Sequence, residues 1–168
     1  MTPQVQLRQF RAEDADWLVE KHADLYANDE GFDATFGPLV ADIVTGFLQN
    51  HDPRLERGWI AESAGQRLGS IFCVRLTDET AKLRLFMVLP EARGQQVGLK
   101  LLKTCMQFAQ DNGYHGMQLW THESHKAACA LYAANGWSLS ASKPVHSFGV
   151  DLVEQSWGIQ FQSVSRKI

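Results

Sequence analysis

Residues 82–108, KLRLFMVLPEARGQQVGLKLLKTCMQF, decide how this chain folds. Residues 82–88 read as a β-strand, and Pro90 ends it because proline has no N–H to donate to a sheet. A short loop with Gly94 and Gly98 follows, and after it apolar side chains recur at helical spacing. The stretch therefore predicts a strand, a tight glycine loop and a helix, in that order.

A loop of this kind suits an anion. The first N–H groups of a helix lack intrahelical partners, and the helix dipole adds positive charge there. Glycine at 94 and 98 lets a phosphate approach the backbone closely. A P-loop is excluded because Gly98 is followed by Leu99 and Lys100 instead of the Lys-Ser or Lys-Thr pair. The G-x-G-x-x-G dinucleotide pattern is also missing.

Length and composition narrow the class of protein. The chain has 168 residues, 45% of them hydrophobic and 21% charged, which predicts one globular domain over residues 1–168. A net charge of −3 argues against a nucleic-acid partner. No apolar run approaches the ~20 residues of a membrane span, and Met1–Gln6 do not resemble a signal peptide. Three widely spaced cysteines favour a reducing cytoplasm over a disulfide framework or a metal site.

The elements in order predict a mixed α/β fold, with one sheet and helices on both faces. Helices are expected after residues 13, 38, 98 and 125, and the segment 28–36 is expected to be a loop. Ser124 is the expected cap of the last helix. Strands are expected at residues 5–10, 59–62, 68–76, 82–88, 116–121, 137–140 and 156–161.

Two segments resemble the GNAT superfamily of acetyl-CoA-dependent N-acetyltransferases. Residues 88–98, VLPEARGQQVG, are similar to its pyrophosphate-binding motif, with Gln96 at the central glycine position. Residues 125–137, HKAACALYAANGW, are similar to its second motif, with His125 at the usual asparagine position. The resemblance implies a mostly antiparallel sheet of about seven strands. Residues 81–84, 119–121 and 147–153 further resemble the acetyltransferase half of bacterial MarR–GNAT fusion proteins.

The resemblance also implies a set of site residues. Acetyl-CoA would be the cosubstrate, with no metal required. Tyr132 would protonate the departing thiolate. The expected coenzyme contacts are Phe86, Met87 and Val88 at the thioester, Arg93, Gly94, Gln95, Gln96, Val97 and Gly98 at the pyrophosphate, and His125 and Ala128 along the pantetheine arm.

The residues alone leave two chemical questions open. A phenol of pKa about 10 can protonate a thiolate, but a tyrosine on an amphipathic helix is more often a core residue. The amine acceptor must also lose a proton. The predicted strand 82–88 carries no carboxylate, so a base or a water relay has to serve elsewhere; the candidates are His122, Glu123, Glu30 and Asp33. His122 and His125 lie three residues apart, not the four that a zincin helix requires.

The expected function is an acetyl-CoA-dependent N-acetyltransferase acting on a primary amine of a small molecule or protein, by direct attack in a ternary complex. The alternative is a non-catalytic acyl-CoA sensor or interaction module. The acceptor is expected between the 28–36 loop and the segments near Thr121 and Ser147, with aromatic walls drawn from Phe32, Trp59, Trp120 and Trp157. Whether the protein is a monomer or a homodimer stays open.

Overall fold

The computed structural model describes residues 4–162. Its helices are α1 (Ala15–Glu30), α2 (Phe36–Asn50), α3 (Val97–Asp111) and α4 (Lys126–Ala134). Its strands are β1 (Gln6–Gln9), β2 (Arg57–Ser63), β3 (Gln66–Arg75), β4 (Thr80–Val88), β5 (Gly116–His122), β6 (Ser138–Ser147) and β7 (Val150–Gln160). The ends of the predicted domain 1–168, including residues 1–3 of the N-terminal segment Met1–Gln6, lie outside the described residues.

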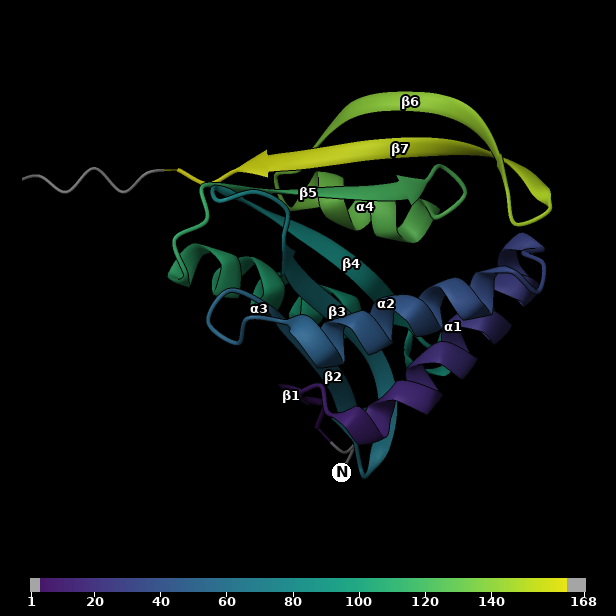
Figure 1. The fold of residues 1–168 in the computed structure, drawn as a ribbon, viewed down its shortest axis with the longest axis horizontal. Coiled ribbons are helices and arrows are strands. Elements are labelled where there is room, and N and C mark those ends of the chain that lie inside the picture. The colour runs from purple at the N-terminus through teal and green to yellow at the C-terminus, as the bar shows by residue number, and fades with distance from the viewer. Residues whose placement is uncertain (1–3, 163–168) are drawn as a thin grey trace, which may run out of the picture.

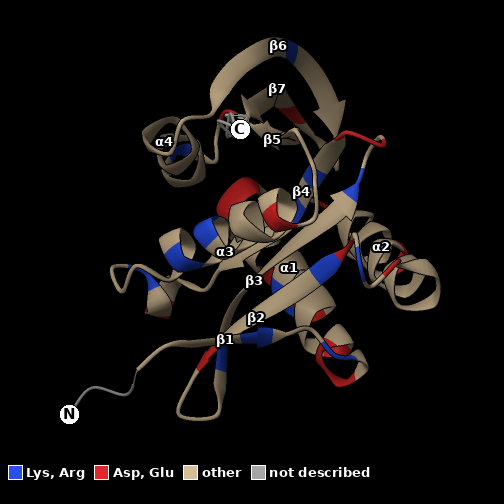
Figure 2. Cartoon of the chain, turned by 90° about the vertical axis from the view of Figure 1, so that its left-hand side faces the viewer, with Lys and Arg blue, Asp and Glu red and all other residues tan. Residues whose placement is uncertain are grey.

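One seven-stranded sheet carries the fold, in the order β1-β2-β3-β4-β5-β7-β6. Its pairings are antiparallel except between β4 and β5. α1 and α2 lie on one face and α3 and α4 on the other (Figures 1 and 2). Each face has its own core: Leu18, Val40 and Val44 pack under α1 and α2, whereas Leu101, Cys105 and Tyr132 belong to the core on the α3–α4 side. The predicted fold class is confirmed.

The parallel pair β4–β5 comes apart after three residues. The pairing with β5 runs only from Thr80 to Lys82, whereas β4 stays paired with β3 as far as Val88. Every second N–H of a strand faces the neighbouring strand, so the second half of β4 offers backbone groups to the gap that β5 leaves. This splayed end is the central feature of the sheet.

A β-bulge in β4 lies at the same point. The register against β3 shifts between Ser70 and Phe72, and Leu85 has φ 52°, a left-handed conformation that is unusual for leucine. Ala81 and Leu83 face α3 before the bulge, but Phe86 and Val88 do so after it. A one-residue shift reverses which side chains face which side of a sheet, so the bulge turns Phe86 toward α4.

Three boundaries differ from the sequence prediction. α1 continues through Glu30 and ends at Gly31, which has φ 71°, so the connection to α2 is shorter than the predicted loop 28–36. Ser124 is not the cap of α4: His125 occupies that position, with no side-chain cap bond. The β6–β7 hairpin is much longer than expected because its strands pair continuously to a tight turn at Phe148 and Gly149.

Candidate active site

The loop after β4 leads into α3 by way of two left-handed residues. Gly94 has φ 84°, and Gln96, which precedes α3, has φ 60°. The carbonyl of Gln96 accepts the N–H of Lys100 at 3.0 Å. The N–H groups of the residues before Lys100 therefore lack intrahelical partners. Residues 93–96 are exposed, so an anion can reach this N-terminus from solvent.

Gly98 lies in the first turn of α3, where it faces α4 and the second half of β4. A Cβ added there would lie 3.4 Å from Cδ2 of Leu131 on α4 and 3.6 Å from the side chains of Phe86 and Val88. Glycine thus keeps a narrow space open between α3, α4 and β4.

Tyr132 lies on α4 beside this space and is 3% exposed. Its ring centroid is 6.1 Å from that of Phe86, 5.6 Å from that of Trp137 and 6.1 Å from that of Trp157. Burial raises the pKa of its phenol well above the ordinary value of 10.0. The phenol therefore keeps its proton at neutral pH and can act as a donor.

The three residues predicted at the thioester alternate across β4. Phe86 and Val88 pack toward the α3–α4 core, and Met87 is buried against the α1–α2 core. Ala128 is half-buried on α4, on the same side as Phe86. Arg93 of the loop lies 3.6 Å from Asp29 near the end of α1, an exposed ion pair that links the loop to α1.

His125 lies at a junction of three elements. Its Nδ1 is 3.1 Å from the hydroxyl of Thr121, and its Nε2 is 3.4 Å from a carboxylate oxygen of Glu30. The Tyr26 ring lies 4.9 Å from the imidazole, centroid to centroid. Burial lowers the pKa of His125, and Glu30 only partly opposes that shift. The Nδ1 of His125 thus pairs with Thr121, whereas its buried Nε2 faces Glu30 without making a hydrogen bond.

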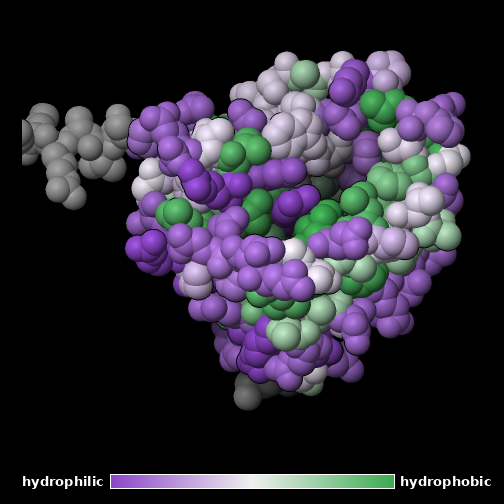
Figure 3. Space-filling view, viewed as in Figure 1, coloured by the Kyte–Doolittle hydropathy of each residue, from purple (hydrophilic) through white to green (hydrophobic). Residues whose placement is uncertain are grey.

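The structure brings together the three segments expected around the acceptor. The N–H of Asp33 donates to the carbonyl of Phe148 at 2.9 Å. The ring centroid of Phe32 is 4.8 Å from that of Phe148 and 5.8 Å from that of His122. Beside this cluster the surface is hollowed between the β6–β7 hairpin and the α1–α2 pair (Figure 3).

Other sequence candidates fall elsewhere. Trp59 is buried edge-on against Phe108, and Trp157 is buried in the same core. Neither ring therefore lines the region expected for the acceptor. Glu123 is exposed. Sequence reasoning missed Tyr26 and Thr121 as neighbours of His125. Had the predicted first helix been extended to residue 30, the four-residue spacing between Tyr26 and Glu30 would have placed both side chains on one face of that helix.

Two kinds of feature are absent from the described residues. Across residues 4–162, no group of three or more His, Cys, Asp or Glu side chains is placed to hold a metal ion. Over the same range, none of the helices combines the length and the apolar character that crossing a membrane requires.

Comparison with known proteins places the chain. The model of the acetyltransferase (GNAT) family matches residues 12–137. N-acetyltransferase 8 of Rattus norvegicus is 32% identical over 103 residues, covering 58% of this chain and 45% of that protein. Human N-acetyltransferase 8 is 33% identical over 116 residues, covering 64% and 48%. The chain thus spans about half the length of the curated relatives it matches.

Solved structures share the fold at lower identity. An acetyltransferase from Streptococcus agalactiae superposes with a TM-score of 0.78 at 21% identity, covering 94% of this chain and 98% of that one. An acetyltransferase from Salmonella typhimurium, solved with its cofactor acetyl-CoA, gives 0.72 at 19% identity and covers 98% of both chains. Because the family model matches residues 12–137, which is most of the chain, this protein belongs to the acetyltransferase (GNAT) family.

Proposed function

We propose that the protein is an acetyl-CoA-dependent N-acetyltransferase that moves an acetyl group to a primary amine by direct attack in a ternary complex. The observation that carries the proposal is the opening between β4 and β5 beyond Lys82, with the anion-binding loop at one side and Tyr132 at another. The family's use of acetyl-CoA and the solved relative with its cofactor agree with this reading.

The pyrophosphate of the coenzyme is held, in this proposal, by N–H groups from Arg93 to Gly98. The four residues Arg93, Gly94, Gln95 and Gln96 form the exposed turn, and buried Val97 anchors the start of α3. Gly98 leaves room for the pantetheine arm to pass Leu131 and Ala128. The imidazole of His125 stands near the start of α4, where the family has an amide.

The thioester lies against Phe86, Met87 and Val88 in the splayed half of β4, and its carbonyl is polarised by those of their backbone N–H groups that face the gap left by β5. The amine nitrogen attacks the carbonyl carbon, a C–N bond forms and the C–S bond breaks. Tyr132 gives its phenol proton to the departing thiolate and regains one from solvent. The proton lost by the amine passes to water or to a nearby base; Glu30 and His122 are the candidates that lie at the junction around His125.

The finer assignments belong to the same proposal. We propose that the protein is bacterial and cytoplasmic, that residues 1–168 form one domain, and that it is related to the acetyltransferase half of MarR–GNAT fusion proteins, which residues 81–84, 119–121 and 147–153 resemble. The free thiols of Cys73, Cys105 and Cys129 suit a reducing compartment.

The test is release of free coenzyme A from acetyl-CoA, read as free thiol, over a panel of primary amines. Amine-dependent release by the purified chain supports the enzyme. Binding of acetyl-CoA by calorimetry without release for any amine supports the acyl-CoA sensor instead. Absence of binding would overturn both readings.

A further inference from the structure

Two cations stand side by side on β4. Lys82 and Arg84 are two residues apart and therefore point to the same face of the sheet. Their neighbours Ala81 and Leu83 are buried in the α3–α4 core, so the two cations belong to the opposite face. Trp120 of β5 shares that face, with the Lys82 ammonium 4.9 Å from its ring centroid.

This face is open where the cations lie. α1 and α2 cover the sheet on the side of β2 and β3, and the surface is hollowed above them, below the β6–β7 hairpin (Figures 1 and 3). Trp120 is a large apolar side chain, yet 43% of it is exposed. Lys82 and Arg84 are half-buried. Lys82 and Arg84 are therefore partly accessible to solvent on this face of the sheet.

Neither cation has a carboxylate partner among residues 4–162. Burial lowers the pKa of Arg84, and it lowers that of Lys82 together with repulsion from Arg84. Two carboxylates nearby in the fold are placed beside other groups. That of Glu154, on β7 beyond β5, lies 3.7 Å from the ammonium of Lys143, and that of Glu30 lies 3.4 Å from His125.

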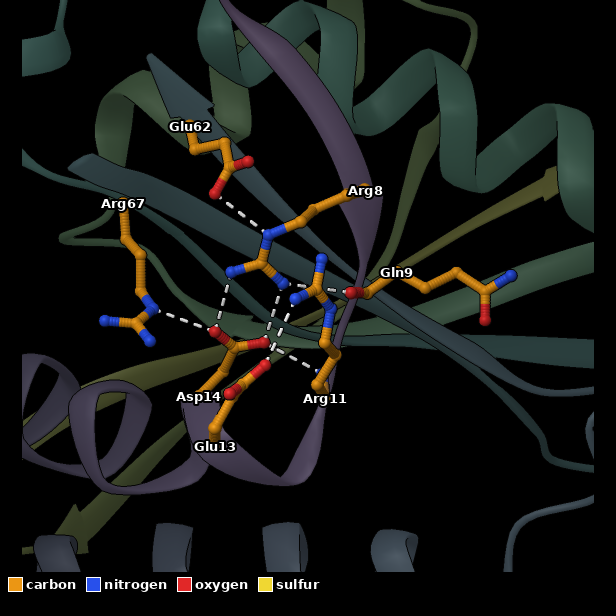
Figure 4. Close-up of polar contacts among 7 residues, drawn as sticks. All are labelled: Arg8, Gln9, Arg11, Glu13, Asp14, Glu62 and Arg67. Carbon is orange, nitrogen blue, oxygen red and sulfur yellow. Dashed lines mark hydrogen bonds and ion pairs between the residues drawn. The ribbon is translucent and has the colours of Figure 1, made fainter. Parts of the chain in front are cut away.

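Arg8, on β1 of the same sheet, shows how a partly buried cation is usually stabilised. Its guanidinium donates to both Asp14 and Glu62, and those bonds raise its pKa (Figure 4). Half-buried cations without such partners cost free energy unless an anion joins them. An arginine and a lysine together match the geometry and charge of a carboxylate or phosphate.

We propose that Lys82 and Arg84 bind an acid group carried by the acceptor, so that the enzyme takes small amines bearing a carboxylate or phosphate. The inference rests on the proposed function and narrows it. Arg84 stands two residues before Phe86, across the bulge at Leu85. In an amino acid the amine and the carboxylate are bonded to one carbon, so an acid group held by the long side chains of Arg84 and Lys82 keeps the amine close to β4, with Trp120 as an apolar wall.

The experiment compares acceptors that differ only in the acid group. The carboxylate arm pairs glycine, L-alanine and L-phenylalanine with their amides, and the phosphate arm pairs O-phosphoethanolamine with ethanolamine. Coenzyme A release gives kcat/KM for each, and calorimetry in the presence of coenzyme A gives affinity without turnover. The wild type should prefer the acid-bearing member of at least one pair by about 10- to 100-fold.

Variants identify the residues. Arg84→Gln and Lys82→Gln should lower the acid-to-amide ratio by about 10-fold or more, mainly through KM, and Arg84→Lys should restore part of it. Lys103→Gln, exposed on α3 at the other face, should keep the wild-type ratio. Melting temperatures show whether each variant folds.

Three results overturn the proposal: equal use of the acid and neutral members in every pair, no binding of any acid-bearing amine, or a wild-type ratio in folded Arg84→Gln and Lys82→Gln. A fourth result separates the two proposals. If the wild type binds acid-bearing amines selectively and Arg84→Gln loses that binding, but no coenzyme A is released, the anion site is supported and only the proposed transferase function is refuted.

Discussion

The hydroxyl of Ser70 on β3 donates a hydrogen bond of 2.7 Å to the carbonyl of Leu85, the left-handed residue of the β4 bulge. Ser70 is fully buried, so its hydroxyl is shielded from water. The bond holds the carbonyl that the bulge displaces from the regular ladder. This hydrogen bond from β3 therefore helps to fix the β4 register that turns the Phe86 side chain toward Tyr132.

Ser70→Ala should destabilise the protein by about 1–3 kcal/mol, because the buried Leu85 carbonyl loses its donor. For a chain of this size that corresponds to a fall of roughly 2–12 °C in melting temperature. Turnover per folded molecule should also fall, since the bulge positions Phe86 and its neighbours. Ser138→Ala, at an exposed position of β6, is the control. Equal melting temperatures for the two variants would show that the bond does not support the bulge.

Tyr132→Phe should lower turnover by about 10²–10⁴-fold if the phenol protonates the thiolate. Coenzyme affinity and melting temperature should change little, because the ring and its packing remain. Tyr114→Phe is the matched control: its hydroxyl donates to the Leu55 carbonyl at 2.8 Å, so that variant should lose stability and keep its turnover. Wild-type turnover in Tyr132→Phe, on an amine that the wild type acetylates, would remove the general-acid role.

Gly98→Asp should abolish coenzyme binding. The added carboxylate repels the pyrophosphate, and the carboxyl group extends beyond a Cβ that is already in van der Waals contact with Leu131 at 3.4 Å. Gly46→Asp in α2, where a Cβ meets nothing within 4 Å, adds the same charge elsewhere. Calorimetry with acetyl-CoA should find binding to the second variant and none to the first. Unchanged affinity in Gly98→Asp would move the pyrophosphate away from α3.

Asp14→Asn should destabilise the fold by about 3 kcal/mol or more, because it leaves buried hydrogen-bond donors without their anion. Asp14 is fully buried and accepts hydrogen bonds from the side chains of Arg8 and Arg67 and from the N–H of Arg11 (Figure 4). Denaturant unfolding should detect the loss, and Asp42→Asn, exposed on α2, should show almost none.

The Asp14 carboxylate should also make the stability of the protein depend on pH in the acid range. Burial by itself raises the pKa of Asp14, but the bonds from Arg8, Arg11 and Arg67 outweigh it and hold that pKa well below the ordinary 3.8. Its stabilisation is therefore complete above the unfolded value and is lost as pH falls below about 4 toward the folded pKa. Between pH 6 and pH 3 the wild type should lose more stability than Asp14→Asn; parallel curves would exclude Asp14 as the cause.

Most of the fold follows from local patterns in the sequence. Pro90, the two glycines of the loop and the apolar spacing of α3 are short-range signals, so the strand, loop and helix are predictable without a structure. The same holds for Tyr132 within its motif. The end of α1 is harder to predict in this way: residues 28–30 are polar and show no period, yet the helix continues through Glu30 and ends at Gly31, whose left-handed φ of 71° terminates it.

The order of elements, the family resemblance and the residues available for chemistry can therefore be read from the sequence. Which of those residues come into contact depends on how the elements pack. The bulge at Leu85 depends on a bond from another strand, and a one-residue shift there exchanges the faces of Phe86 and Met87. The pairing of Glu30 with His125, and the lack of a partner for Arg84 among the described residues, depend on contacts between segments distant in the chain. Spacing within one segment carries no record of such contacts, because they arise only when the elements pack.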